Sequence, residues 1–202
     1  MSAKYLTFER LPVELQNRAI YRDVANKQIL VQQGETANMI NFLISGQIRL
    51  VTFTEERIIS HYFVMGGESF GETALFSDIY TCSAIADRPS RVAAIDKQIF
   101  RQAIAENSEL TNIYMNQLTY RYHTVKTLLE LRSIRSARER LIQYLIRQKE
   151  SDSQTIVLQR PLKYLATELG LSAEALSRTL SILQSEGLIT RRQRSITLSE
   201  DW

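Results

Sequence analysis

Polar side chains that can hydrogen-bond the edges of nucleic-acid bases recur at helical spacing near the C-terminus. Glu174, Ser177 and Arg178 stand three and four residues apart. In a helix that turns about 100° per residue they share one face, with Ser181 beside them. Arginine can donate to guanine O6 and N7 in the DNA major groove, and glutamate can accept from cytosine N4. The same spacing fits a solvated helix face with an ordinary glutamate–arginine pair, so spacing alone leaves both interpretations open.

Two short helices must position these side chains. The first is expected at Leu162–Leu169, and Gly170 after it can adopt the positive φ of a helix C-cap. Ser172 can cap the second helix. The apolar face of that second helix consists of Leu176, Leu180 and Leu183. A short helix carrying Ala166, a glycine corner and a second helix are typical of a DNA-reading helix-turn-helix. We therefore favour base recognition, with Ser172 and Ser181 as flanking DNA contacts.

An arginine-rich hairpin is expected directly after this second helix. Gly187 ends the helix, and the runs LIT and SITL then pair around Arg191, Arg192 and Arg194. Three arginines within four residues suit contact with DNA phosphates by a wing. The alternative is a solvated turn, and the neighbouring helix-turn-helix favours the wing.

Composition and cysteine usage exclude several classes of protein. Of 202 residues 44% are hydrophobic, and only three prolines and seven glycines occur, which indicates a folded chain with a substantial core. The formal charge is +3 without a polybasic run, so DNA binding must depend on individually placed arginines. The single cysteine, Cys82, excludes an internal disulfide and a multi-cysteine metal site.

The sequence also predicts what the protein is not. His61 and His123 are its only histidines, and we expect no metal site. No set of nucleophile, base and acid is visible, so we do not predict an enzyme. No signal peptide and no run of about 18 apolar residues is present, and we expect a cytoplasmic protein without a membrane partner.

Short β-rich runs separated by glycines dominate the N-terminal half, after an expected lead-in helix over Leu11–Tyr21. Their spacing of roughly ten residues per strand predicts a small antiparallel barrel or jelly roll. In the second run, Ile48, Leu50 and Thr52 are expected on one face and the residues between them on the other. The runs cover residues 27–35, 39–53, 57–72 and 90–96, the last one bounded by Pro89.

The stretch between Phe70 and Ala86 departs from this strand rhythm. Gly71 and Glu72 precede a helix-like turn over Thr73–Phe76, whose backbone N–H groups are a natural place for an anion.

A long helix is expected over Phe100–Arg135. Apolar residues follow a 3-4-3-4 spacing along it, which predicts the seam of a two-stranded coiled coil. The alternative is a helix that packs on its own barrel. The seam residues are Met115, Leu118, Tyr122, Val125 and Leu129. A further amphipathic helix follows, with Leu141, Leu145 and Ile146 expected inward.

Two motif sets resemble one family of bacterial regulators. Gly34-Glu35, Gly46, Gly67-Glu68 and the stretch from Phe70-Gly71-Glu72 to Ser83-Ala84 resemble the cyclic-nucleotide-binding barrel of the Crp/Fnr family. Glu174-x-x-Ser177-Arg178 is similar to its recognition-helix motif. The resemblance implies an α+β fold with an N-terminal antiparallel β jelly-roll sensor barrel (1–107), a long dimerisation helix (108–135) and a C-terminal winged helix-turn-helix DNA-binding domain (136–202).

The same resemblance implies a homodimeric, sequence-specific DNA-binding transcription regulator. Its partners would be a palindromic double-stranded operator, a second copy of the chain and, for an activator, RNA polymerase. Ala173 replaces a base-contacting arginine of cyclic-AMP-binding members, and Ser177 matches the Fnr-like branch. A TTGA-like half-site is therefore expected rather than TGTGA.

The implied ligand pocket departs from the family at one position. By resemblance, Glu72 holds a ribose hydroxyl and Ser83 a phosphate oxygen, and the N–H groups near Thr73 and Ala74, which follow Gly71, donate. Arg121 is a further candidate for the pocket, because it lies beside the expected seam of the long helix, within reach of the barrel. Cyclic-AMP-binding members carry a phosphate-binding arginine where this chain has Cys82. We therefore expect no cyclic nucleotide and no certain cofactor. We expect a small effector other than cyclic AMP to gate DNA binding. The alternatives are a constitutive DNA-binding dimer with a ligand-free structural barrel and a signalling adaptor that does not bind DNA.

Overall fold

The computed structural model describes residues 6–149, 153–158 and 161–199. The chain divides into two compact units, Met1–Tyr122 and His123–Trp202, and each has its own hydrophobic core.

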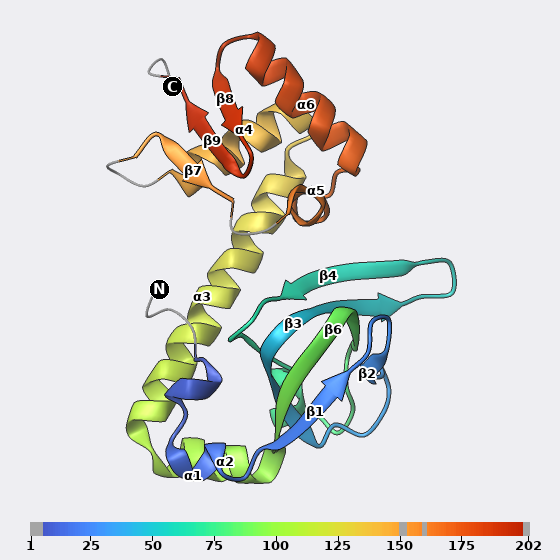
Figure 1. Ribbon diagram of the computed structural model, residues 1–202, viewed down its shortest axis with the longest axis vertical. Helices are drawn as coiled ribbons and strands as arrows, with labels where there is room; N and C mark the ends of the chain where they lie inside the picture. The colour runs from blue at the N-terminus through green and yellow to red at the C-terminus, as the bar shows by residue number, and fades with distance from the viewer. Residues whose placement is uncertain (1–5, 150–152, 159–160, 200–202) are drawn as a thin grey trace. The chain divides into compact units, whose positions relative to one another are not determined.

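Six antiparallel strands form the barrel of the first unit (Figure 1). The sheet order is β1-β6-β3-β4, with β2 on β6 and β5 on β3. The strands are β1 (Ile20–Val24), β2 (Ile29–Val31), β3 (Met39–Phe53), β4 (Ile58–Val64), β5 (Ser69–Phe70) and β6 (Ser83–Asp96). The short 3-10 helix η2 (Glu72–Leu75) lies between β5 and β6. The predicted antiparallel β barrel is confirmed.

Strand β6 is longer than predicted. It begins at Ser83 and contains Pro89, so the irregular stretch ends at Cys82 rather than at Ala86. Proline is tolerated here because the register between β3 and β6 shifts on either side of Gly46. Gly46 has φ +100, and a Cβ there would lie 2.3 Å from Ser90 Oγ, so only glycine fits this close approach.

Burial along β3 also departs from the expected alternation. Ile48 and Val51 are both fully buried, although strict alternation predicts opposite faces for them. The sheet is irregular beside these residues. The pairing of β3 with β6 shifts between Gln47 and Ile48, and in the pairing with β4 the extra residue is His61 of β4, since Leu50 pairs with Tyr62 and Val51 with Ser60.

Two helix boundaries differ from the prediction. The lead-in helix is only α1 (Val13–Gln16), preceded by η1 (Phe8–Arg10), and Ile20 and Tyr21 belong to β1 because they pair with β6. The expected helix from Phe100 is two helices, α2 (Lys97–Glu106) and α3 (Ser108–Ser133). Asn107 separates them with extended backbone, and its Oδ1 accepts from Leu110 N at 2.9 Å.

Helices α1 and α2 lie side by side (Figure 1). Aromatic packing attaches η1, α2 and α3 to the barrel. Phe42 of β3 lies 6.0 Å from Phe8 and 6.1 Å from Phe100 between ring centroids, and Phe100 lies 5.8 Å from Tyr114 of α3. All four rings are buried, so the N-terminal part of α3 is fixed on the barrel core.

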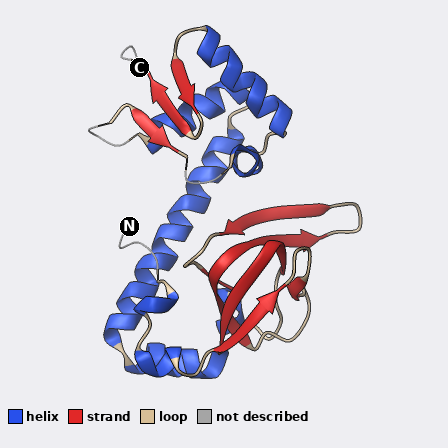
Figure 2. Ribbon diagram, in the orientation of Figure 1, coloured by secondary structure: helices blue, strands red, loops and turns tan. Residues whose placement is uncertain are grey.

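The second unit is a three-stranded sheet with helices around it (Figure 2). The strand order is β7-β9-β8, all antiparallel. The elements are α4 (Ala137–Gln148), β7 (Thr155–Val157), α5 (Leu162–Leu169), α6 (Ala173–Ser185), β8 (Ile189–Arg192) and β9 (Ser195–Leu198). The predicted winged helix-turn-helix is confirmed. Ile146 was expected inward and is instead 45% exposed, because it lies about 100° around α4 from Leu145.

Candidate nucleic-acid interface and ligand pocket

Local capping and a leucine stripe fix the orientation of α6. At the start of α6, Ser172 Oγ accepts a hydrogen bond from Ala175 N at 3.0 Å. Leu176, Leu180 and Leu183 are buried. Gly187 has φ +74 and follows the last turn, where Leu188 N donates to Leu183 O at 3.0 Å.

The opposite face of α6 is exposed along its length. Glu174, Ser177, Arg178 and Ser181 are all exposed. Within the described part of the chain, Glu174 and Arg178 form no ion pair with each other. The alternative of an ordinary glutamate–arginine pair on a solvated helix face is therefore not observed. Hydrogen bonds from the backbone at the helix N-terminus and from Ser172 lower the pKa of Glu174, which keeps it an ionised acceptor. Ser181 Oγ donates to Ser177 O at 3.1 Å and can still accept.

The arginines of the hairpin differ in position. Arg191 and Arg192 lie in β8, and Gln193 and Arg194 form the turn, so the tip is shorter than expected. Arg192 and Arg194 are exposed and Arg191 is half-buried. Gln193 has φ +53, an uncommon conformation for a non-glycine residue that sequence reasoning did not find.

Two arginines that sequence reasoning missed hold the corner of the helix-turn-helix. Arg132 of α3 donates to the carbonyls of Thr167 and Glu168, at 2.8 and 2.9 Å. Arg140 of α4 donates to the Leu169 carbonyl at 2.7 Å. The last carbonyls of a helix have no partner within it, so these guanidinium groups complete the C-terminus of α5.

The predicted anion site at η2 is only partly present. Gly71 has φ +82 and precedes η2, as the sequence indicates. Ala74 is fully buried, and its N–H donates to the Gly71 carbonyl at 2.9 Å. That N–H is therefore unavailable to a ligand, contrary to the prediction. Thr73 is exposed and its Oγ1 lies 3.4 Å from Thr81 Oγ1.

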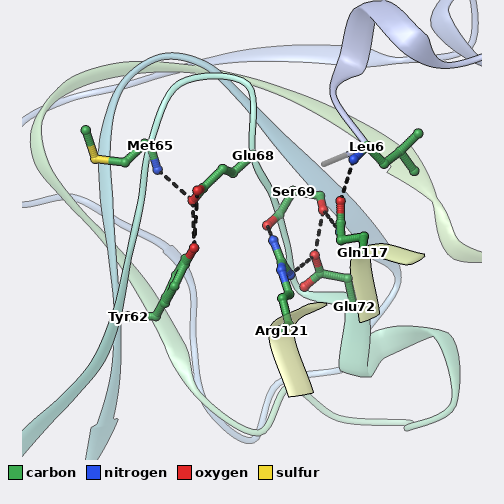
Figure 3. A network of polar contacts seen from close by, with 8 residues as sticks. All are labelled: Leu6, Tyr62, Met65, Glu68, Ser69, Glu72, Gln117 and Arg121. Carbon is green, nitrogen blue, oxygen red and sulfur yellow. Dashed lines mark hydrogen bonds and ion pairs between the residues drawn. The ribbon is translucent and has the colours of Figure 1, made fainter. Parts of the chain in front are cut away.

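Glu72 and Arg121, two residues assigned to the expected pocket, pair with each other (Figure 3). Arg121 Nη1 forms an ion pair with Glu72 Oε1, and Ser69 Oγ donates to the same oxygen at 2.6 Å. Arg121 Nη2 donates to the Ser69 carbonyl at 2.8 Å. The guanidinium carbon lies 5.9 Å from the centre of the Tyr62 ring. The side chains are 23% exposed for Arg121 and 14% for Glu72, so water screens this pair only weakly.

A buried glutamine that sequence reasoning missed extends this network. Gln117 is fully buried one turn before Arg121. Its Nε2 donates to Ser69 Oγ at 2.8 Å, and its Oε1 accepts from Leu6 N at 2.7 Å. Glutamine in a helix usually faces solvent. Its spacing of three residues from Tyr114 and four from Arg121 was the available clue.

A second carboxylate, that of buried Glu68, also acts on the charge of Arg121 and belongs to the same polar network (Figure 3). Glu68 accepts from the Tyr62 hydroxyl at 3.1 and 3.2 Å and from Met65 N at 3.1 Å. Sequence reasoning did not assign Glu68 to the pocket.

The residues expected to hold a phosphate do not supply a charge. Ser83 is buried, and its Oγ accepts from Gln33 N at 2.8 Å. Burial raises the pKa of the Cys82 thiol, and the negative charge of Glu72 raises it further. The thiol is therefore neutral at pH 7, and position 82 has no cation.

The predicted seam on α3 is largely exposed. Met115 is 55% exposed, Tyr122 73%, Val125 56% and Leu129 64%. Leu118 is half-buried against the barrel core. Large apolar side chains in a row on a helix surface indicate a surface that another apolar surface covers.

Other kinds of site are not found in the part of the chain that the structure describes. Across residues 6–149, 153–158 and 161–199, no group of three or more histidine, cysteine or acidic side chains is arranged to hold a metal ion. Over the same ranges, no helix is both long and apolar enough to span a membrane.

Comparison with known domain families matches both units. The cyclic nucleotide-binding domain matches residues 21–107, and the Crp-like helix-turn-helix domain matches residues 139–200. The cAMP-activated global transcriptional regulator CRP of Pasteurella multocida (strain Pm70) is 26% identical over 183 residues, which cover 86% of this chain and 87% of that protein.

Solved structures agree with the fold. A CooA mutant from Carboxydothermus hydrogenoformans has a TM-score of 0.72 at 18% identity, covering 90% of this chain and 84% of that one. The c-di-GMP responsive global regulator CLP of Xanthomonas campestris has a TM-score of 0.65 at 20% identity, covering 90% of this chain and 94% of its own.

Proposed function

The chain belongs to the Crp/Fnr family of transcription regulators, and we propose that it acts as a homodimer that binds a palindromic operator without cyclic AMP. The observation that carries the proposal is the exposed polar face of α6. Glu174, Ser177 and Arg178 lie on that face over a buried leucine stripe, with Ser172 and Ser181 at its flanks. A helix held in this way can enter the major groove with its N-terminal residues towards the bases.

Pairing of two α3 helices is the second part of the proposal. The exposed residues Met115, Tyr122, Val125 and Leu129, with half-buried Leu118, supply an apolar stripe that a second copy can cover. Two copies related by two-fold symmetry read two half-sites, so the operator has the same symmetry. In the cytoplasm, RNA polymerase becomes a further partner if the protein activates transcription.

Arg191, Arg192 and Arg194 take the role of phosphate contacts in this proposal. The hairpin carries the exposed cations of Arg192 and Arg194 and the half-buried one of Arg191, and a hairpin tip reaches the DNA backbone more readily than the base edges.

Two forms of regulation are compatible with the barrel. The ion pair of Glu72 with Arg121 favours a barrel that needs no ligand. One observation favours a small effector instead: among the described residues, Arg121 Nε is buried and has no hydrogen-bond partner. An effector of that kind would offer an acceptor to this nitrogen.

Selection of binding sites from random DNA by the purified protein tests the proposed function. We expect palindromes with TTGA-like half-sites spaced about 10–11 bp centre to centre. Selected sites without two-fold symmetry would contradict the dimeric mode of binding. Failure to enrich any sequence, with and without a panel of cyclic AMP, cyclic GMP, cyclic di-GMP and metabolites, would instead favour the adaptor that does not bind DNA.

A further inference from the structure

We propose that Arg132 and Arg140 are positioning residues, which fasten the DNA reader formed by α5 and α6 to the end of α3. The second unit thereby sets the spacing of the two half-sites by itself. The inference rests on the proposed function, in which two α3 helices pair and α6 reads DNA. It concerns the second unit alone, because that unit begins at His123 and so contains the last turns of α3 together with the whole reader.

The end of α3 is part of the hydrophobic core of the second unit. Leu131 is 1% exposed and belongs to the same buried cluster as Leu165 of α5 and Leu176 of α6. On the same stretch of α3, the proposed seam residues Val125 and Leu129 are 56% and 64% exposed. These last turns therefore carry two apolar faces, one for the reader and one for the second copy. Apolar packing is non-directional, so polar contacts must define the angle between α3 and the reader.

Arg132 connects α3 to the end of α5. Its Nε donates to the Glu168 carbonyl at 2.9 Å, and its Nη2 donates to the Thr167 carbonyl at 2.8 Å. The planar guanidinium group thus binds two adjacent carbonyls of one helix end, a fork-like geometry that a lysine does not reproduce. The side-chain stem lies along the corner, because a Cβ at Gly170 would be 3.7 Å from both Cγ and Cδ of Arg132.

Arg140 connects the link between α3 and α4 to the same helix end. Its Nε and Nη2 both donate to the carbonyl of Ile134, at 3.0 and 2.6 Å, and its Nη1 donates to the Leu169 carbonyl at 2.7 Å. Only residues 134–136 separate α3 from α4. Carbonyls at a helix C-terminus have no partner within the helix, so each of these bonds satisfies an acceptor that water would otherwise serve. Arg140 is half-buried, which strengthens its bonds relative to those of exposed Arg132.

The contacted carbonyls determine where α6 begins. Those at the end of α5 belong to residues 167–169, and only residues 170–172 separate them from α6. The proposed base-reading residues Glu174, Ser177 and Arg178 lie in the first turns of α6. The two arginines therefore fix the direction of these side chains relative to α3, and hence relative to the two-fold axis of a dimer that pairs through α3.

A reader fixed in this way demands one spacing between half-sites. One additional base pair shifts a half-site by about 3.4 Å along the DNA and turns it by about 34° around the DNA axis. Both copies of α6 reach their bases at the new spacing only if the arginine contacts break. The two arginines thus convert the direction of α3 into a requirement for operator geometry, which base contacts alone do not specify.

Two ion pairs of α4 do not hold this corner. Arg147 pairs with Glu130 of α3 at 3.0 Å, and the two side chains are 39% and 48% exposed. Arg138 pairs with Glu186 at the end of α6, at 2.6 Å, again between exposed side chains. Neither pair involves the end of α5 or the corner after it, and exposed ion pairs contribute little to stability. Arg147 is therefore the matched control, an arginine of the same helix with the same charge.

The experiment measures how full-length proteins tolerate changes in half-site spacing. The reference operator is the palindrome that wild type selects from random DNA, and two further DNAs lengthen or shorten its spacer by one base pair. Fluorescence anisotropy, in the buffer of that selection, gives the dissociation constants for these DNAs and for scrambled DNA. The proteins are wild type, Arg132→Gln, Arg140→Gln, the double variant and the control Arg147→Gln. Circular dichroism and sedimentation equilibrium establish that each protein is folded and dimeric.

We expect wild type and Arg147→Gln to bind both respaced operators about 100-fold or more weakly than the reference. Misplacing one half-site removes several base contacts, each of which contributes about 10-fold to 100-fold in affinity. For the double variant the difference should shrink to about 10-fold or less, since the reader can then turn to follow the displaced half-site. Each single variant should lie between these limits, and Arg140→Lys should discriminate better than Arg140→Gln because it retains one carbonyl bond. Preference for individual bases within a half-site should stay unchanged in every variant, whereas a misfolded reader would lose it.

Two results would overturn the inference and leave the proposed function intact. One is a folded, dimeric double variant that discriminates against the respaced operators as strongly as wild type. If the double variant does not fold, the single variants answer the same question. The other is wild type that binds all three spacings with similar affinity, a result that needs no variant. Wild type that selects no sequence, or only sites without two-fold symmetry, would instead refute the proposed function.

Discussion

Arg132 Nε donates to the Glu168 carbonyl at 2.9 Å, which bonds the last turn of α3 to the end of α5. Arg140 makes a parallel connection, because it donates to the Leu169 carbonyl and, through Nη2 at 2.6 Å, to Ile134 directly after α3. Gly170 packs against Arg132, and a Cβ at position 170 would lie 3.6 Å from Arg132 Nε. The end of α3, the link to α4 and the corner before α6 are thus one hydrogen-bonded assembly.

Arg132→Ala should weaken this assembly. The substitution removes two charge-assisted bonds at an exposed helix end, where water replaces part of what is lost, so we expect a stability loss of about 1 kcal/mol. Chemical denaturation followed by circular dichroism measures it. Arg132→Lys should lose less stability than Arg132→Ala, since a cation near a helix C-terminus remains favourable. A loss of stability equal to that of Lys126→Ala, which removes an exposed cation elsewhere on α3, would show that the carbonyl contacts are immaterial.

Arg178→Ala tests base recognition. Loss of a bidentate contact with guanine should cost about 1–3 kcal/mol in operator binding and relax discrimination at one G·C pair. Competition between operators substituted at single positions measures this directly. Gln184→Ala changes an exposed residue nearer the end of α6 and should leave discrimination unchanged. Uniform weakening across all operator positions would assign Arg178 to a phosphate instead.

The corner and α6 could be predicted from the sequence because their determinants are local. Gly170 at positive φ, the Ser172 cap and Gly187 after the helix act within a few residues, and each appears as expected. The apolar face of α3 that contains exposed Val125 could be predicted as well, because the heptad pattern is also local to one helix. Periodicity reports which face is apolar, and the structure shows which apolar faces the chain does not cover itself.

The features that were missed depend on contacts between distant segments. Arg121 contacts Glu72 and the Ser69 carbonyl, about fifty residues earlier in the chain, and no local pattern indicates that pairing. Ile20 and Tyr21 look helical in their own neighbourhood but pair with β6. The extra residue His61 of β4, opposite Leu50 and Val51, depends on how two strands pair and leaves no local pattern.

Substitution of a wing arginine should weaken specific and non-specific binding alike. Arg194→Ala removes one exposed cation, and if that cation neutralises one phosphate the slope of log K against log salt should fall by about one unit. Titrations at several salt concentrations on operator and scrambled DNA provide the slope. A variant with altered base preference and an unchanged slope would assign Arg194 to base recognition.

Val125→Glu should dissociate the dimer and abolish operator binding. The substituted carboxylate would be desolvated opposite its own copy across the two-fold axis, and burying an unpaired charge is strongly unfavourable. Sedimentation equilibrium measures the oligomeric state. Asn116→Glu adds the same charge at an exposed position of α3 away from the seam and should remain dimeric. An unchanged dimer for Val125→Glu would place the interface elsewhere.

Cyclic AMP should not bind the wild type at micromolar concentration. Removing one partner of a buried ion pair costs about 3–5 kcal/mol. At about 1.4 kcal/mol per tenfold, this lowers affinity by two to three orders of magnitude. Position 82 lacks the cation, and Arg121 is committed to Glu72. Titration calorimetry with cyclic AMP and cyclic GMP on wild type measures the affinity, and micromolar binding would refute the prediction.

Restoring the cation separates the contributions of Cys82 and Arg121 to this loss. Cys82→Arg supplies a phosphate partner but leaves Glu72 paired with Arg121, so the gain in cyclic AMP affinity should be small. Cys82→Arg combined with Arg121→Gln also frees the carboxylate for a ribose hydroxyl and should gain the most. Arg121→Gln alone should gain nothing, because the phosphate still meets no cation. Full binding by Cys82→Arg alone would mean that cyclic AMP displaces Arg121 readily, and that the arginine missing at position 82 accounts for the whole difference from cyclic-AMP-binding relatives.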